Sequence, residues 1–149
     1  MKPLFARASI IGLALLLSAC ATVPMAPSSE SQAVKQFNAP KKGDSALYIY
    51  RDSSFGAALK KNLYIDDKFI GQSAPKVFFY KTVKAGDHKI STESEFSNND
   101  LNIKTESGKN YFIRQYIKFG VFVGGANLEQ VSEEVGKKAV SKLNMAVSH

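Results

Sequence analysis

Few side chains in this sequence have types and spacings suited to chemistry. The chain contains two histidines, His88 beside a Gly-Asp turn signal and His149 at the last position. Hydrolysis needs a nucleophile, a base and a group that orients the base, and a zinc site needs a cluster of cysteine and histidine. The sequence contains neither pattern, so we interpret His88 as a residue that packs beside a turn. We therefore predict that the protein is not an enzyme and has no metal site and no cofactor.

The single cysteine, Cys20, is the other reactive side chain, and it follows a segment typical of an export signal. Lys2 and Arg7 precede an apolar run over residues 8–17, and small residues then lead up to the cysteine. A basic start, a short apolar run and a small-residue cleavage site are typical of a secretory signal peptide. The run has about ten residues, whereas a helix that spans a bilayer needs roughly twenty. We predict a signal peptide over residues 1–19.

Residues 17–20, Leu-Ser-Ala-Cys, resemble the lipobox of bacterial lipoproteins. In that class the cysteine thiol is acylated and the signal peptide is cut ahead of it, which implies lipidation of Cys20. An aspartate in the next position is the usual signal for retention at the inner membrane in enterobacteria, and this chain has Ala21 there. The resemblance therefore implies a lipoprotein of the bacterial outer membrane whose domain faces the periplasm. One acyl chain anchors only marginally, and the several chains of a lipoprotein hold durably.

The mature chain is mildly basic and begins with a segment of low complexity. Removal of residues 1–19 leaves 18 basic and 13 acidic residues, so the net charge falls from +7 to +5. The basic residues are dispersed, which is typical of a solvated surface, and export argues against nucleic acid as a partner. Residues 20–43 are rich in proline, serine and alanine. This composition predicts a flexible tether that lifts the domain off the membrane.

From residue 44 onward, short β-prone runs alternate with turn signals. The pair Asp66-Asp67 lies between two such runs and predicts a tight hairpin. Polar and apolar residues alternate over 101–105, which predicts a strand with one wet face. The runs recur at roughly ten-residue spacing, which favours an antiparallel sandwich or barrel over alternating strands and helices. We predict a mainly β fold, with an antiparallel β-sandwich over residues 44–127.

Residues 128–149 have a different pattern. Apolar residues recur at intervals of three and four from Leu128 to Leu143, with glutamates early and lysines late. This predicts a C-terminal amphipathic helix whose charges suit its dipole, followed by a tail. Gly136 interrupts this helix at a cost of about 1 kcal/mol relative to alanine, so two short pieces are an alternative.

Aromatic residues crowd the predicted strands and include candidates for binding. Most of them are needed to fill the core of a small sheet protein that has no tryptophan. Exposed aromatic side chains would instead form a platform for a glycan or a protein, and we select Tyr64, Tyr80 and Phe122 as possible partner-binding residues. Phe122 belongs to an apolar run between Gly120 and Gly125, which is either the last strand or an exposed loop.

Several ordered segments resemble the DUF2846 group of bacterial lipoproteins. They are Ala46–Asp52, Leu63–Gly71, Ala85–His88, Ser107–Phe112 and Leu128–Val131. The layout is also similar to PEGA-type domains, which are small β-sandwiches of cell-surface proteins. The resemblance covers most of residues 44–143 and implies a β-sandwich. The group has no assigned activity, so the resemblance implies no catalytic or ligand residue.

The leading interpretation is a non-enzymatic outer-membrane lipoprotein that is held by the lipid on Cys20 and presents its domain to an envelope protein or glycan. A peptidoglycan-binding or hydrolytic domain is an alternative, and it needs tyrosines and carboxylates side by side on an exposed face. A second alternative is an assembly component resembling the transthyretin-like lipoproteins of type VI secretion machines. A third is a lipid carrier, which needs an apolar cavity between the sheets. The sequence leaves the oligomeric state open.

Overall fold

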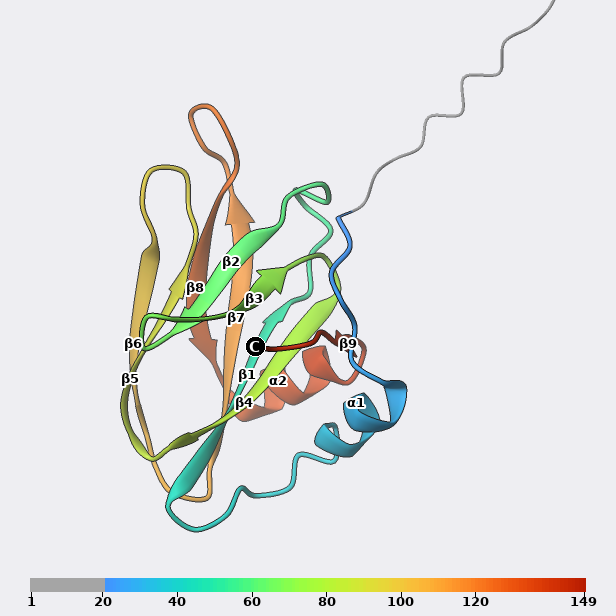
Figure 1. The fold of residues 1–149 in the computed structure, drawn as a ribbon, viewed down its shortest axis with the longest axis vertical. Coiled ribbons are helices and arrows are strands. Elements are labelled where there is room, and N and C mark those ends of the chain that lie inside the picture. Colours follow the sequence, from blue (N-terminus) through green and yellow to red (C-terminus); the bar gives the residue numbers. More distant parts are fainter. Residues whose placement is uncertain (1–20) are drawn as a thin grey trace, which may run out of the picture.

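The computed structural model describes residues 21–149, and this part of the chain contains nine strands and two helices (Figure 1). The helices are α1 (Ser28–Val34) and α2 (Glu133–Val140). The strands are β1 (Asp44–Arg51), β2 (Lys61–Ile65), β3 (Lys68–Ser73), β4 (Val77–Lys84), β5 (Gly86–Thr92), β6 (Asn99–Thr105), β7 (Asn110–Lys118), β8 (Gly125–Val131) and β9 (Asn144–Met145). The prediction of a mainly β fold is confirmed.

The strands form two sheets, one ordered β8-β7-β1-β4-β9 and the other β3-β2-β5-β6. Neighbours that follow each other closely in sequence are antiparallel, as predicted. However, β1 runs parallel to β7 and β4 runs parallel to β9, so the five-stranded sheet is mixed. Parallel partners are joined by long connections, and a pattern of local turns gives no signal for them. The predicted antiparallel arrangement is therefore wrong for these two pairs.

A hydrophobic core fills the space between the two sheets. Its main members are Leu47, Ile49, Leu63, Ile65, Ile70, Val77, Phe79, Ile90, Ile103, Ile113 and Leu128. Two buried hydrogen bonds between side chains also join the sheets. The Ser45 hydroxyl donates to Thr105 Oγ1 at 2.8 Å, and Gln115 Nε2 donates to Thr92 Oγ1 at 2.7 Å. These bonds satisfy polar groups that would be costly to bury unpaired.

The N-terminal segment packs on the outer face of the five-stranded sheet. The Ala26 N–H donates to the Met145 carbonyl at 2.9 Å, and the Tyr48 hydroxyl donates to the Val34 carbonyl at 2.9 Å. Farther along, the Phe37 ring lies 5.4 Å from the Tyr48 ring. The described part of the predicted tether, residues 21–43, therefore contains a helix and belongs to the fold. Its few apolar residues gain their stability from contacts with the sheet, which composition alone does not reveal.

The C-terminal region forms a strand, a short helix and another strand. Leu128 lies in β8, and α2 begins only after Ser132, whose hydroxyl accepts the Val135 N–H at 3.3 Å. The chain then returns to the five-stranded sheet as β9. The predicted helix from Leu128 to Leu143 is therefore wrong in extent. A strand with one wet face followed by a capped helix of eight residues, about two turns, reproduces the spacing of three and four.

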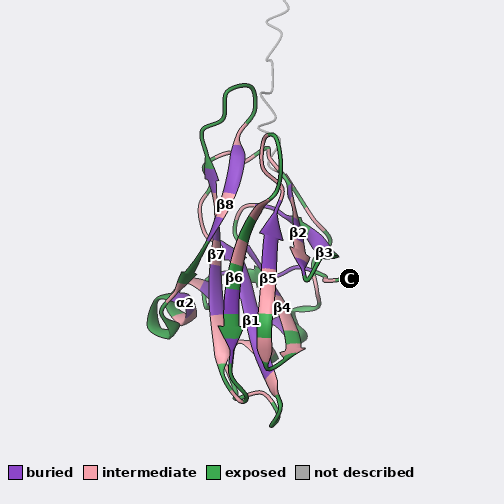
Figure 2. Cartoon of the chain, turned by 90° about the vertical axis from the view of Figure 1, so that its left-hand side faces the viewer, coloured by how far each residue is buried: buried purple, intermediate pink, exposed green. Residues whose placement is uncertain are grey.

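Three loops meet at one end of the molecule, the upper end in Figure 1. They are the β1–β2 loop (residues 52–60), the β5–β6 loop (93–98) and the β7–β8 loop (119–124). The question left open for Gly120–Gly125 is thus answered, since residues 119–124 form a loop that is largely exposed (Figure 2). Among residues 21–149, no helix is both long enough and apolar enough to cross a bilayer.

Candidate functional site

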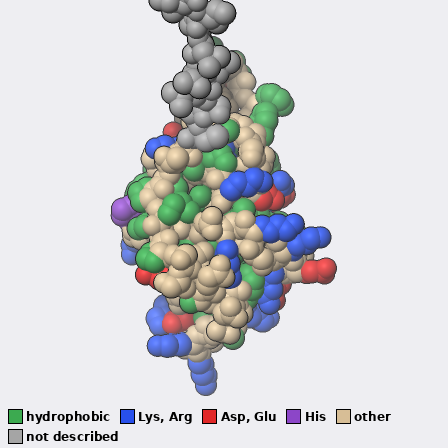
Figure 3. All heavy atoms as spheres, turned by 90° about the vertical axis from the view of Figure 1, so that its right-hand side faces the viewer, with side chains coloured by type: hydrophobic (Ala, Val, Ile, Leu, Met, Phe, Trp, Pro, Cys, Tyr) green, Lys and Arg blue, Asp and Glu red, His purple; other side chains and the backbone are tan. Residues whose placement is uncertain are grey.

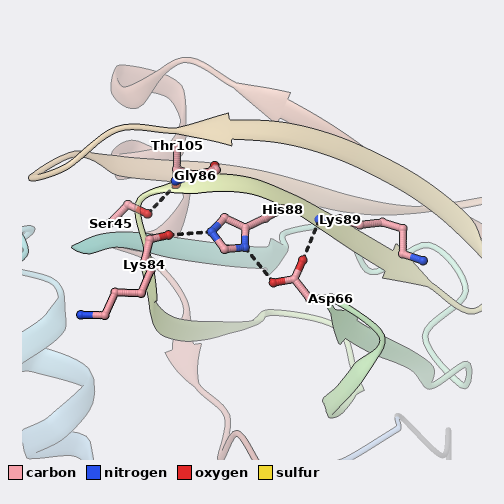
Figure 4. A network of polar contacts seen from close by, with 7 residues as sticks. All are labelled: Ser45, Asp66, Lys84, Gly86, His88, Lys89 and Thr105. Atoms are coloured by element: carbon pink, nitrogen blue, oxygen red, sulfur yellow. Dashed lines mark hydrogen bonds and ion pairs between the residues drawn. The ribbon is translucent and has the colours of Figure 1, made fainter. Parts of the chain in front are cut away.

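His88 joins the β2–β3 hairpin to the start of β5. The hairpin turn consists of Asp66 and Asp67, whose φ angles of 50° and 63° fit the two-residue turn that was predicted. His88 Nδ1 lies 2.7 Å from Asp66 Oδ2, and its Nε2 lies 2.7 Å from the Lys84 carbonyl oxygen (Figure 4). Asp66 Oδ1 also accepts the Lys89 N–H at 3.0 Å. A carbonyl and a carboxylate only accept, so both contacts are hydrogen bonds when both ring nitrogens carry a proton, and the site favours the protonated imidazole.

The charges of this pair support each other. Burial opposes the charge on His88, but the hydrogen bonds to Asp66 and Lys84 and the nearby carboxylates outweigh it and raise the pKa of His88. Burial likewise opposes the charge on Asp66, but the Lys89 N–H and His88 lower the pKa of Asp66. Because both ring nitrogens are engaged, neither can take a proton from a substrate without breaking the network. This geometry fits the interpretation of His88 as a residue that fixes a turn.

Metal-binding side chains do not gather in the described part of the chain. Within residues 21–149, histidine, cysteine, aspartate and glutamate form no group of three or more that could hold a metal ion. Cys20, the predicted lipidation site, lies outside the described residues.

The three candidate binding residues lie on three separate surfaces. Tyr64 is on β2, on the outer face of the four-stranded sheet. Tyr80 is on β4, on the outer face of the five-stranded sheet, with its ring 5.0 Å from the Tyr48 ring. Phe122 is in the β7–β8 loop, and its side chain is 84% exposed. The structure therefore does not bring them together, and each one belongs to a different neighbourhood.

Tyr64 is part of an aromatic and amide cluster. Its ring lies 5.8 Å from that of Phe69, which stacks in turn at 5.8 Å on the ring of His149. Asn62 Nδ2 donates to the Tyr64 hydroxyl at 3.3 Å, and Gln72 Nε2 donates to Asn62 Oδ1 at 2.9 Å. We call these five residues the sheet-face cluster. No local pattern in the sequence points to Phe69 and His149, because their contact depends on strand register and on where the C-terminus lies.

Phe122 is part of a larger apolar surface at the end where the three loops meet. Its ring pairs with that of Phe96 at 6.4 Å, and the rings of Phe55 and Phe119 pair at 5.1 Å. All four of these side chains are exposed, Phe119 by 87% and Phe96 by 76%. We define the loop-end patch as Phe55, Phe96, Phe119, Val121, Phe122 and Val123. Exposed apolar groups that are gathered in this way mark interaction surfaces.

The β7–β8 loop has a fixed conformation because Glu95 binds its backbone. The carboxylate of Glu95 accepts the N–H groups of Val121 at 2.7 Å, Phe122 at 2.5 Å and Val123 at 3.2 Å. The hydrogen bond from Phe122, with those from Val121 and Val123, lowers the pKa of Glu95. A side chain at Gly120 would run into the Val123 carbonyl, so the turn needs glycine there. Three consecutive donors at the tip are thereby satisfied.

The β1–β2 loop is held from below by a buried arginine. The Arg51 guanidinium donates to the carbonyl groups of Leu59 at 2.6 Å, Gly56 at 2.8 Å and Phe55 at 3.1 Å. Burial lowers the pKa of Arg51. The Ala57 carbonyl of this loop accepts the Ala21 N–H at 2.9 Å. The first described residue is therefore bound to the same end that carries the loop-end patch.

Comparison with known proteins gives a family but no function. A family model described as "Protein of unknown function (DUF2846)" matches residues 41–126. A protein of Haemophilus influenzae strain Rd, described as "Uncharacterized protein", is 83% identical over 149 residues, which cover all of this chain and 89% of that protein. No solved structure gives a significant match.

Proposed function

The chain belongs to the DUF2846 family of proteins of unknown function, and we propose that it is an outer-membrane lipoprotein that acts by binding. In this proposal the acylated thiol of Cys20 anchors the protein, and the domain faces the periplasm. The signal-like segment and the lipobox-like residues 17–20 support the anchor. The engagement of both nitrogens of His88 argues for a structural role of that residue and against catalysis by it.

The lipobox-like residues 17–20 carry the proposal, and the hydrogen bond from the Ala21 N–H to the Ala57 carbonyl, 2.9 Å long, indicates at which end of the domain the anchor would lie. Ala21 is the residue after Cys20, so the proposed lipid attaches directly beside a structured loop. The anchor would then fix which end of the domain is next to the membrane. The outer face of the four-stranded sheet would remain free for a partner in the periplasm.

The test is replacement of the thiol in the full chain, expressed in a Gram-negative host. The parent protein is expected to incorporate labelled palmitate and to fractionate with the outer membrane. Cys20→Ser is expected to lose the label and to leave the membrane fraction, because a hydroxyl does not replace the thiol as acyl acceptor. Ser18→Ala is the matched control and should be labelled like the parent. An unlabelled parent protein would contradict the proposal.

A second candidate function is recognition of an envelope glycan by the sheet-face cluster. Phe69 is 42% exposed, and its ring lies between those of Tyr64 and His149. The amides of Asn62 and Gln72 sit on the same face and offer both donors and acceptors. Sugars present apolar ring faces and hydroxyl groups, which match flat aromatic rings flanked by amides.

Cosedimentation with purified peptidoglycan tests this second function. Phe69→Ala is expected to reduce the pelleted fraction severalfold, because it removes the central ring of the cluster. Tyr80→Phe is the matched control, since it changes an aromatic residue on the opposite sheet, and it should pellet like the parent. Equal sedimentation of the parent and Phe69→Ala would count against glycan binding at this face.

A further inference from the structure

We propose that the loop-end patch is a membrane-contact surface, with the aromatic tips of three loops lying in the interfacial layer of the bilayer that holds the lipid anchor. This inference rests on the proposed acylation of Cys20. It adds that the domain contacts the bilayer directly through its own side chains.

The first argument is the shortness of the connection. The Ala21 N–H binds the Ala57 carbonyl, and the Val147 N–H binds the Pro24 carbonyl at 2.9 Å, so the chain is fixed to the domain from its first described residues. Ala21, which is hydrogen-bonded to the β1–β2 loop, follows the proposed acylation site directly in the sequence, and neighbouring Cα atoms across a trans peptide are about 3.8 Å apart. If Cys20 carries the lipid, no free segment of chain separates the lipid from the loop end, so the loop end would lie at the bilayer surface.

The second argument is the chemistry of the loop tips. Residues 54–59, 96–98 and 119–124 include no charged side chain. The tips instead carry the four phenylalanines and two valines of the patch, and apolar residues of this kind bind in the interfacial region of a bilayer. Figure 3 shows hydrophobic side chains projecting at the upper right of the molecule, while lysine and arginine lie mainly along its right-hand side and at its lower end. The distribution therefore fits an end that contacts lipid.

Basic residues also lie where the headgroups would be. Lys60 and Lys118 are exposed and stand at the bases of the β1–β2 and β7–β8 loops, just behind the apolar tips. When the tips enter the interface, these ammonium groups reach the level of lipid phosphates, which attract them. The acidic side chain nearest the tips is Glu95, whose carboxylate is engaged by the β7–β8 loop.

The third argument is that the tip is prepared for a less polar medium. An unpaired N–H is costly to move out of water. Glu95 satisfies the N–H groups of Val121, Phe122 and Val123, three consecutive residues of the patch. Arg51 holds three carbonyls of the β1–β2 loop in the same way. The loops therefore need no refolding to bury their apolar side chains.

A bilayer fits this surface better than a partner protein does. With the anchor beside the patch, a protein bound there would have to lie between the domain and the membrane to which the domain is attached. The bilayer already occupies that position, and its interface accepts a ring of loop tips without requiring a complementary shape.

A tryptophan reporter tests the proposal, because the sequence contains no tryptophan. Phe122→Trp and the control Phe69→Trp are made in the full chain, purified in lipidated form and placed in phosphatidylethanolamine and phosphatidylglycerol vesicles. The reporter at position 122 is expected to show blue-shifted emission, protection from acrylamide and quenching by lipids brominated in their acyl chains. The control tryptophan at position 69, on β3, should emit as a tryptophan in water does and should not be quenched by the brominated lipids.

The outcomes separate this inference from the proposed anchor. The intact mass of the purified protein is measured first, to determine whether Cys20 is acylated. An unmodified thiol would overturn both proposals. A lipidated, vesicle-bound protein whose reporter at position 122 is as open to acrylamide as the control would overturn the membrane contact alone. A blue shift without quenching by bromine would indicate self-association and would also overturn it. Phe119→Trp repeats the measurement if the first variant has an altered unfolding midpoint.

Discussion

Among single residues, His88 and Asp66 tie the stability of the fold to pH. The folded protein raises the pKa of His88 above its ordinary 6.5. The stabilisation from its proton is therefore complete below about pH 6.5 and is lost as the pH rises through the folded-state pKa. Asp66 has a lowered pKa, so its contribution is present above its ordinary 3.8 and is lost as the pH falls through the folded value. The pair stabilises most between these two limits.

Removal of the imidazole should expose this dependence. We expect His88→Ala to lower the free energy of unfolding by about 1 kcal/mol near pH 6, because Asp66 is partly exposed and water screens the pair. The difference from the parent should shrink as the pH rises through the raised folded-state pKa of His88. Urea unfolding at a series of pH values measures it. His149→Ala is the control, and a parallel shift of both variants at all pH values would contradict the account.

At the scale of helices and strands, the sequence predicts those elements whose formation depends on residues close together in the chain. The hairpin at Asp66-Asp67 was found because two turn residues with positive φ are enough to make it. The helix α1 was missed because its sequence is polar, with Ser31 as its buried residue, and it is held by packing against the sheet. The parallel pairing of β1 with β7 was missed because the two strands are far apart in the sequence.

The same distinction applies to the candidate site. Phe122 was selected because glycines flank its apolar run, which makes an exposed loop visible in the sequence. Phe55 and Phe96 are not among the predicted binding residues, since each is a lone aromatic residue outside the predicted strands. They become part of a surface only when the β1–β2, β5–β6 and β7–β8 loops meet at one end. No local pattern predicts that meeting.

At Gly136 in α2, close packing against the neighbouring strand outweighs the low helix propensity of glycine. Alanine is a better helix former than glycine by about 1 kcal/mol, which alone would make Gly136→Ala stabilising. However, an added Cβ would overlap the ring of Phe112 on β7. We expect a net loss of about 1–3 kcal/mol, measured by urea unfolding. Lys138→Ala, at an exposed position of α2, should be nearly neutral. A higher midpoint for Gly136→Ala would show that α2 is not packed as described.

The N-terminal segment is tested by its aromatic contact. Phe37 lies 5.4 Å from the Tyr48 ring and 5.8 Å from the Phe112 ring. Phe37→Ala should therefore destabilise the domain by about 2 kcal/mol, less than the 3–5 kcal/mol of a fully buried phenylalanine. Gln36→Ala, at the exposed neighbouring position, is the control for chemical denaturation. Equal unfolding midpoints for Phe37→Ala and the parent would contradict this packing and would support a flexible N-terminal segment.

For the whole molecule, the loss of the tether changes how the domain relates to the membrane. A flexible segment over residues 20–43 would have held the domain away from the bilayer. With Ala26, Val34 and Phe37 packed on the five-stranded sheet and Ala21 hydrogen-bonded to the β1–β2 loop, the proposed anchor would be next to the loop end instead. The turn at 84–86 and the loop at 106–109 then lie at the far end, with the sheet-face cluster between the two ends.

All of this depends on the covalent state of Cys20, so the most direct measurement is the intact mass of the mature protein extracted from native membranes. We predict a chain that begins at Cys20 and carries the added mass of a diacylglycerol and an amide-linked acyl group. A chain with an unmodified thiol, or one that still includes residues 1–19, would contradict the account.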